Sequence, residues 1–385
     1  MRHLTDRRAM SRARVVVAGL GDSGVLTAIK LARHADVVGI SAKPGLLSGQ
    51  ELGMRLSRPD DWARYNWITF DRFRGLDRVR TLHGTLTGVD LAARKVFVQR
   101  GDGSTLAEPY DALVISTGVT NGFWRQSRLQ SADEIAADLR AAHQRLAAAR
   151  SVIVIGGGAA AVSSAANLAR THPDKRIGLY LPGDRALVHH HPRVWGRVSR
   201  RLSEFGVEVH AGHRAIVPDG FGCDDLTTGP VRWSTGQPET AADAVLWAIG
   251  RVRPNTQWLP PELLDEHGFV RVTPELRVPG QRGVFAIGDV AATDPLRTSA
   301  RNRADGLLAH NIRAEFAGKP LRSYRPASRR WGSVLGPQPD GLEVFTPRGQ
   351  AVGFPGWSID RVLMPWIVWR GIYRGVRADS VSRKL

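Results

Sequence analysis

Short apolar runs followed by stretches of helical spacing recur along this chain. The β-branched run at residues 15–17 turns through glycines at 19–24 into a stretch that predicts a helix ending near residue 34. A second strand is expected at 37–40, and alternating apolar and polar positions over 79–99 predict antiparallel strands. Residues 111–118 are typical of a buried strand that ends in Thr-Gly. Such strand–helix alternation indicates an α/β fold with parallel sheets.

The same alternation returns in the second half of the chain, where the apolar run at 152–155 turns through three glycines into a helix. Further helices are predicted at 132–149, 160–171 and 194–205, and strands at 177–181, 207–210, 244–250 and 283–289, with a last helix ending near residue 316. We therefore expect two Rossmann-like domains with three-layer ββα architecture, the second inserted in the first. The predicted bounds are 12–120 with 251–320, then 121–250, and a C-terminal segment at 321–385.

Two glycine fingerprints are the most informative motifs. The first has Gly19, Gly21 and Gly24 after its strand, and the second has Gly156, Gly158 and Ala161. A sharp glycine turn into a helix lets a pyrophosphate lie against bare backbone, where N–H groups and the helix dipole favour negative charge. Two such motifs in one chain indicate two nucleotides held face to face.

Composition narrows the function classes. The 385 residues include 54 basic and 36 acidic ones, a net charge of +18, but the arginines are spread along the chain, so nucleic-acid binding is not favoured. Cys223 is the single cysteine, which excludes a redox-active pair. The histidines at 189–191 alternate sides and lack further ligands, so we expect a solvated loop and no metal site. Residues 1–14 lack the apolar core of a secretory signal, which favours a cytoplasmic location.

The segment 359–377 combines apolar positions near helical spacing with two tryptophans and flanking arginines. It is too short to span a bilayer. Three interpretations stay open: peripheral contact with the inner face of the cell membrane, docking on this protein, or docking on a partner in a homodimer. Trp331, Phe354 and Trp357 could line an apolar acceptor tunnel or form the core of a small cap.

The order of these motifs resembles that of the two-dinucleotide-binding flavoproteins, the FAD- and NAD(P)-dependent pyridine nucleotide oxidoreductases, over residues 14–316. Within them the chain is most similar to the apoptosis-inducing-factor-like and type II NADH:quinone oxidoreductase branch. The resemblance implies that hydride passes from the nicotinamide to the flavin and electrons then pass to an acceptor. It assigns one set of residues to FAD, namely Gly19, Gly21, Gly24, Thr117, Gly118, Gly288 and Asp289, and another to NAD(P)H, namely Gly156, Gly158, Ala161 and Gly250.

Three departures from the family pattern bear on the cofactors. Ser41 stands where a carboxylate usually binds the adenosine ribose of FAD, so FAD binding would depend in part on Lys43. Leu181 stands where an acid selects NADH, and Arg185 follows, which slightly favours NADPH as co-substrate. In the second fingerprint, Ser163 stands two residues after Ala161, where the family often has an acidic residue. The helix after Asp289 is expected to direct its N-terminus, with Arg297, Arg301 and Arg303, at the flavin.

The leading hypothesis is an FAD-dependent NAD(P)H oxidoreductase, peripheral to the membrane, that reduces a quinone or another small-molecule acceptor. No catalytic acid or base is assigned, because the cofactor carries the difficult step. Two alternatives stay open. One is an NAD(P)H–ferredoxin-type reductase, for which the basic surface suits an acidic carrier. The other is a non-catalytic flavin-binding protein that acts through protein or nucleic-acid interactions.

Overall fold

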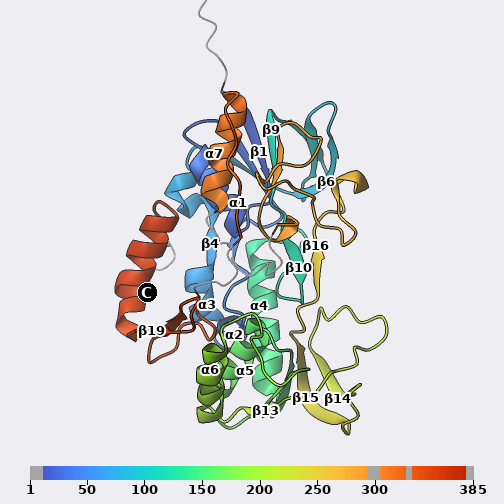
Figure 1. Ribbon diagram of the computed structural model, residues 1–385, viewed down its shortest axis with the longest axis vertical. Helices are drawn as coiled ribbons and strands as arrows, with labels where there is room; N and C mark the ends of the chain where they lie inside the picture. The colour runs from blue at the N-terminus through green and yellow to red at the C-terminus, as the bar shows by residue number, and fades with distance from the viewer. Residues whose placement is uncertain (1–11, 294–303, 327–331, 379–385) are drawn as a thin grey trace, which may run out of the picture.

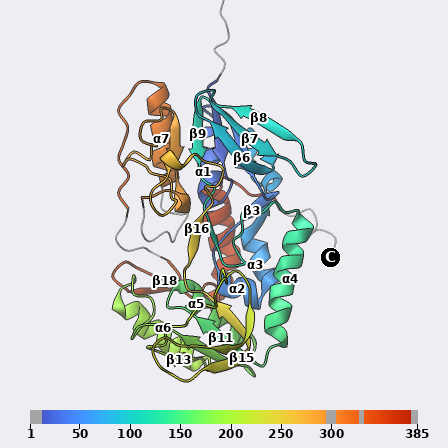
Figure 2. The ribbon, with the colours of Figure 1, turned by 90° about the vertical axis from the view of Figure 1, so that its right-hand side faces the viewer.

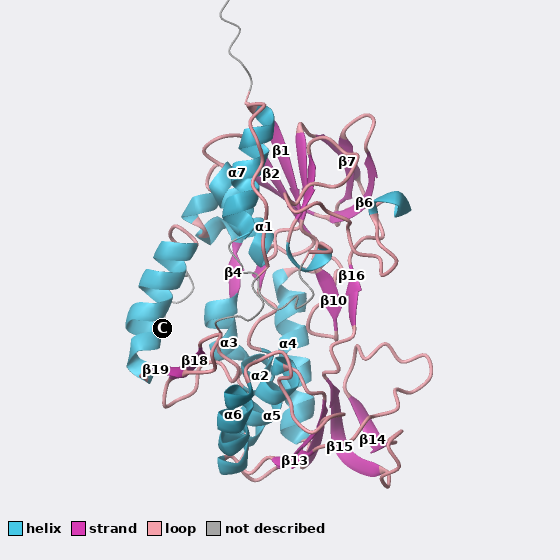
Figure 3. Ribbon diagram, in the orientation of Figure 1, coloured by secondary structure: helices cyan, strands magenta, loops and turns pink. Residues whose placement is uncertain are grey.

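A computed structural model describes residues 12–293, 304–326 and 332–378. Figure 1 shows an elongated molecule with one sheet towards each end and the last helix along one side. Figure 2, turned by a quarter, places this helix beside the middle of the molecule, and Figure 3 separates helices from strands by colour. The mixed α/β architecture with parallel sheets confirms the predicted fold class.

The first sheet has the strand order β17-β9-β1-β2-β5, and all of its pairs are parallel. Its strands are β1 (Arg14–Ala18), β2 (Asp36–Ser41), β5 (Val79–His83), β9 (Ala112–Ile115) and β17 (Val284–Ala286). The expectation of antiparallel strands over 79–99 is wrong for β5, which pairs in parallel with β2, and is confirmed for the strands at 85–90 and 95–99. β5 is a partly exposed edge strand, so its mixture of apolar and polar positions resembles that of an antiparallel strand with one solvated face.

Two further layers cover the first sheet. Apolar side chains of α1 (Asp22–Leu31) and α7 (Ala304–Phe316) pack on one face. A three-stranded antiparallel sheet packs on the other, formed by β6 (Thr85–Asp90), β7 (Lys95–Gln99) and β8 (Thr105–Pro109). Shorter elements in this half are β3 (Gly45–Leu47), β4 (Trp67–Thr69), α3 (Pro59–Asn66), η1 (Phe70–Arg72), η2 (Arg74–Leu76), η3 (Pro261–Leu263) and η4 (Gly288–Val290).

The second sheet has the order β13-β12-β11-β15-β14, in which only β14 is antiparallel to its neighbour. Its strands are β11 (Ser151–Ile155), β12 (Arg176–Tyr180), β13 (Glu208–His210), β14 (Thr227–Val231) and β15 (Thr240–Trp247). Helices α5 (Ala159–Thr171) and α6 (Pro192–Glu204) cover one face, and α4 (Ala132–Ala148) adds Leu146 to that core. Aromatic residues, among them Tyr180 and Trp233, fill the other face.

The two halves are joined twice. Strand β10 (Val119–Asn121) leaves the first half, β16 (Val252–Pro254) returns to it, and the two pair as an antiparallel ribbon. Helix α2 (Leu52–Ser57) also packs against α5. A Cβ atom on Gly53 would overlap the backbone of Ser163, so the two helix backbones lie in close contact.

The C-terminal segment contacts both halves. The hairpin β18 (Leu342–Phe345) and β19 (Ala351–Phe354) packs beside α6, and Arg197 pairs with Glu343. After α8 (Gly356–Ser358), the helix η5 (Ile359–Ile372) has π-type hydrogen bonding and continues through Pro365. It docks on the first half, where Tyr373 meets Phe73 edge-on at 5.2 Å between ring centroids. None of the helices in the described ranges has the length and apolar character needed to cross a bilayer.

Candidate active site

A cavity of about 1940 Å³ lies between the two halves. Both glycine turns line it, and so do residues of the linker ribbon and of the C-terminal segment. Ten of the residues assigned from the sequence line its wall, namely Gly19, Gly21, Ser41, Lys43, Thr117, Gly118, Gly158, Gly250, Gly288 and Asp289. The cavity is therefore large enough, and continuous enough, to bring two dinucleotides together.

The first fingerprint builds a cradle from backbone alone. Gly19 has a φ of +101°, and a Cβ there would press on the backbone of Ser116. A Cβ on Gly24 would overlap the carbonyl oxygen of Gly19. Gly21, by contrast, has open space where a side chain would stand, and no side chain caps α1 behind it. The free N–H groups of α1 thus face a space that fits a pyrophosphate.

The second fingerprint repeats this construction. Gly156 has a φ of +139°, and a Cβ there would overlap the carbonyl oxygen of Ala248. Ala161, in the place of the third glycine, is fully buried. Gly158 faces open space at the uncapped start of α5. The alanine therefore packs inside the motif and leaves the open glycine position unobstructed.

Asn255, which follows β16, holds Thr117 and Gly118 against the ribbon that β10 and β16 form. Its backbone N–H donates to the Gly118 carbonyl at 3.0 Å, and its side-chain amide donates to the Thr117 carbonyl at 3.0 Å. The Thr117 hydroxyl donates back to the Asn255 carbonyl at 2.7 Å. Gly118 itself has a φ of +66°, which suits glycine. The sequence motif around Pro254 thus holds the cavity wall in place.

Ser41 and Lys43 lie together at the end of β2. The Ser41 hydroxyl accepts from the Lys43 backbone N–H at 3.1 Å. The Lys43 ammonium donates to the Arg128 carbonyl and to the Gln130 side chain. Burial, with the nearby Arg128 charge, lowers the pKa of Lys43 from 10.5 to about 8. A partly buried cation therefore lies two residues after Ser41, which holds the position where the family pattern has a carboxylate.

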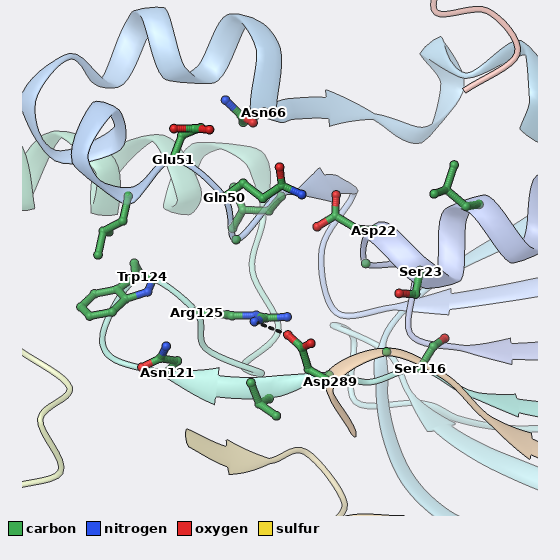
Figure 4. A pocket seen from close by; sticks show the side chains of 18 of the residues that line it. Asp22, Ser23, Gln50, Glu51, Asn66, Ser116, Asn121, Trp124, Arg125 and Asp289 are labelled. Carbon is green, nitrogen blue, oxygen red and sulfur yellow. Dashed lines mark ion pairs between the residues drawn. The ribbon is translucent and has the colours of Figure 1, made fainter. Parts of the chain in front are cut away.

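Arg125 is a cavity residue that sequence reasoning missed. Its guanidinium pairs with the Asp289 carboxylate at 2.7 Å, and Figure 4 shows this pair in the cavity with Asp22 and Gln50 near it. Figure 4 also shows Glu51 above the same space. Arg125 thus brings a positive charge to a wall that holds four carboxylates, those of Asp22, Glu51, Asp289 and Asp305. No motif marks it, because it lies in the irregular loop after β10.

Several assigned residues lie away from the cavity wall. Gly24, Gly156 and Ala161 have packing positions inside their motifs. Arg185 does not line the cavity, since one guanidinium nitrogen donates to the Val188 carbonyl at 3.4 Å and another is buried with no partner in the described part of the chain. Arg297, Arg301, Arg303 and Trp331 lie outside the described residues. Phe354 lines the cavity, whereas Trp357 is 62% exposed.

The histidine run corrects a second expectation. His189 is exposed, as a solvated loop requires, but His190 is partly buried and lines the cavity beside Gly157 and Gly158. His191 accepts from the Arg193 backbone N–H at 3.2 Å, so it caps α6. The loop folds back because Leu187 adopts a left-handed conformation and donates to the Gly157 carbonyl at 2.7 Å. Sequence spacing carries no signal for that turn.

The far end of the cavity is apolar. Both strands of the C-terminal hairpin and the helix η5 contribute to it, with Leu342, Val344, Phe354, Ile359, Leu363, Met364, Ile367, Val368 and Ile372. Tyr65 and Asn66 also line the cavity. The C-terminal hairpin and η5 thus supply an apolar stretch of wall, here called the apolar chamber, to the same cavity that both cradles line.

Known proteins match this chain in sequence and fold. The family model for pyridine nucleotide-disulphide oxidoreductases matches residues 13–306. Human ferroptosis suppressor protein 1 is 26% identical over 361 residues, covering 88% of this chain and 89% of that protein. The type II NADH:quinone oxidoreductase Ndh of Mycobacterium tuberculosis is 27% identical over 287 residues, covering 62% and 59%. A solved ferredoxin reductase from Rhodopseudomonas palustris superposes with a TM-score of 0.64 at 19% identity, covering 86% and 81%.

These matches confirm the resemblance inferred from the motifs. The family implies FAD and NAD(P)H as cofactors, and the open positions at Gly21 and Gly158 fit two dinucleotides. With the match extending over most of its length, the chain belongs to the pyridine nucleotide-disulphide oxidoreductase family.

Proposed function

We propose that this chain is an FAD-dependent NAD(P)H oxidoreductase that passes electrons to a quinone-type acceptor. The observation that carries the proposal is the single cavity, which joins two phosphate cradles to an apolar chamber. When bound, FAD supplies a ring that accepts hydride from the nicotinamide and releases electrons to a second substrate. The protein contributes orientation and charge.

In this proposal the first cradle holds FAD. The open side of Gly21 faces its pyrophosphate, and Asp289 holds its ribityl hydroxyls. Lys43 and Ser41 bind the adenosine ribose. Arg125, which reaches the same wall, offsets the negative charge of the pyrophosphate. Gly158 faces the pyrophosphate of NAD(P)H, and the absence of an acid at Leu181 keeps NADPH our preferred co-substrate.

A quinone suits the apolar chamber. Its wall presents aliphatic side chains and Phe354, which would bury an isoprenoid-like or aromatic molecule. The Mycobacterium tuberculosis relative is named a quinone oxidoreductase, which supports the same acceptor class. A ferredoxin cannot enter such a chamber, so it would have to take electrons at the surface.

The outer face of η5 supports membrane contact. Val362 and Trp366, which do not line the cavity, are 43% and 58% exposed, while Ile359 and Val368 on the inner face are buried. Arg370 lies over the Trp366 ring at 5.0 Å, and Arg361 is exposed on the same helix. An exposed apolar stripe with basic flanks is typical of helices that lie in a bilayer interface. We propose that this face brings the chamber to membrane-dissolved quinone.

Anaerobic spectroscopy tests the electron transfer. Purified protein with bound flavin should lose its absorbance near ~450 nm when NADPH or NADH is added, and a naphthoquinone should restore it. Ferricyanide and a ferredoxin serve as comparison acceptors. Fast reoxidation by ferredoxin with slow reoxidation by naphthoquinone would replace the proposed acceptor. Protein that contains no flavin and takes up none would end the proposal.

Vesicle sedimentation tests the membrane contact. The wild type should sediment with vesicles that contain anionic phospholipid, and the double variant Val362→Ser/Trp366→Ser should stay in the supernatant. The matched control is Ile216→Ser, because Ile216 is also exposed, at 39%, but lies in the other half of the molecule. Equal sedimentation of the double variant and the wild type would contradict the proposed face.

A further inference from the structure

Three consecutive histidines have three different environments. His189 is exposed, His191 caps α6, and only His190 lines the cavity. The proposed function gives His190 no role. Its place beside the second glycine turn suggests that it has one.

The loop that carries His190 is held tightly against that turn. Leu187 donates to the Gly157 carbonyl at 2.7 Å, and His190 donates its own backbone N–H to the Leu187 carbonyl at 2.8 Å. Through these two bonds, Leu187 connects His190 to the backbone of Gly157 in the second fingerprint. The imidazole consequently lines the cavity with Gly158 and Ala159 at the start of α5.

One imidazole nitrogen also lacks a partner. The Nδ1 atom is buried and makes no hydrogen bond among the residues that the structure describes. A buried polar nitrogen without a partner costs free energy, which a turn of the ring that brings Nδ1 to a ligand in the cavity would recover. The adjoining residues of α5, Ala159 and Ala160, have no polar side chains. What α5 does offer is its free N-terminal N–H groups, which attract an anion.

We propose that His190 donates a hydrogen bond to a pyrophosphate oxygen of NAD(P)H bound at the N-terminus of α5. This assignment rests on the proposed function, because it places the nicotinamide nucleotide in the second cradle. The imidazole then adds a directed donor to a site that otherwise uses backbone alone. Because the pyrophosphate is common to both nucleotides, His190 acts equally on NADH and NADPH.

Protonation links this contact to pH. Burial, and then the neighbouring His189, lower the pKa of His190 from 6.5 in the free protein. The other charged groups on its loop are Asp184 and Arg185, whereas α5 presents alanines and the hairpin presents Gly349 to the adjacent His191. A phosphate at the imidazole favours the protonated ring and raises its pKa. Nucleotide binding should therefore take up a proton and tighten as the pH falls towards 6.

Calorimetric titration of the FAD-loaded protein with NADP⁺ and NAD⁺ tests the assignment. His190→Leu should weaken both nucleotides by a similar factor, roughly tenfold to hundredfold, as expected for one charge-assisted hydrogen bond. Titrations in two buffers of different ionisation enthalpy should show proton uptake for the wild type and none for the variant. The exposed neighbour gives the matched control, because His189→Leu should retain both affinity and proton uptake.

A second variant guards against a folding defect. His190→Asn keeps an N–H donor near the Nδ1 position, so it should restore much of the affinity but not the proton uptake. Equal affinity of His190→Leu and wild type would overturn the assignment, and so would a loss confined to NADP⁺. A wild-type protein that binds FAD but neither nucleotide would overturn the proposed function as well.

Discussion

The second glycine of the first fingerprint offers a sharp test of the FAD cradle. Gly21 has a φ of −74°, which alanine adopts freely, and a Cβ there meets no protein atom within 4 Å. Gly21→Ala should therefore fold normally. Loss of chain entropy in the unfolded state stabilises it by up to about 1 kcal/mol. The poorer helix cap destabilises it by a similar amount.

The same methyl group should harm cofactor binding. It fills the space between the backbone and the pyrophosphate, so at least one charge-assisted hydrogen bond of about 1.5–3 kcal/mol is lost. The dissociation constant for FAD should rise roughly tenfold to hundredfold. Gly24→Ala is the matched comparison, because its Cβ overlaps the Gly19 carbonyl oxygen and should destabilise the protein itself by about 1–3 kcal/mol.

Two measurements separate these effects. Quenching of FAD fluorescence by the apoprotein gives the dissociation constant, and circular dichroism during heating gives the melting temperature. Gly21→Ala should change the first and not the second, whereas Gly24→Ala should lower the melting temperature. Tight FAD binding by Gly21→Ala, or a melting temperature as low as that of Gly24→Ala, would refute the assigned cradle.

Other residues of the cavity wall give further predictions. Asn255→Ala should lower the free energy of unfolding by about 1–3 kcal/mol, measured by urea denaturation, because it leaves buried hydrogen-bonding groups without partners. Lys43, with its pKa lowered to about 8, binds fewer protons when folded than when unfolded between pH 8 and 10.5. The stability of the wild type relative to Lys43→Met should therefore rise across that window, which melting curves can follow. Arg125→Gln should leave the melting temperature of the apoprotein nearly unchanged, because its ion pair with Asp289 is partly exposed, yet weaken FAD about tenfold in the fluorescence titration.

The sequence predicts the parts of this molecule that depend on local backbone geometry. The two fingerprints are recognisable because only glycine tolerates the φ values at Gly19 and Gly156. Asn255 and Asp289 also belong to motifs that follow a strand directly. Asp289 lines the cavity, as its place after the parallel strand β17 requires, and Asn255 supports the wall from the end of the antiparallel strand β16.

Residues that reach the cavity from irregular segments could not be predicted. Arg125 and His190 arrive through loops whose course depends on tertiary contacts, such as the bond from Leu187 to Gly157. For the same reason Arg185, which follows the expected spacing, faces its own loop. Pro365 weakens a helix prediction for residues 359–377. The helix η5 nevertheless runs through Pro365 without a break, and Val368 and Tyr373 pack in the core of the first half.

The close contact between α2 and α5 has a consequence for catalysis. Gly53 touches neither cradle, yet it sets how near the two helix backbones approach, because any side chain would meet the Ser163 backbone. A methyl group at Gly53 would wedge the halves apart, and misplacement of reacting rings by about 1 Å can slow a reaction about a hundredfold. If the proposed function holds, the rate of hydride transfer should depend on the absence of a side chain at Gly53, a residue that does not line the cavity.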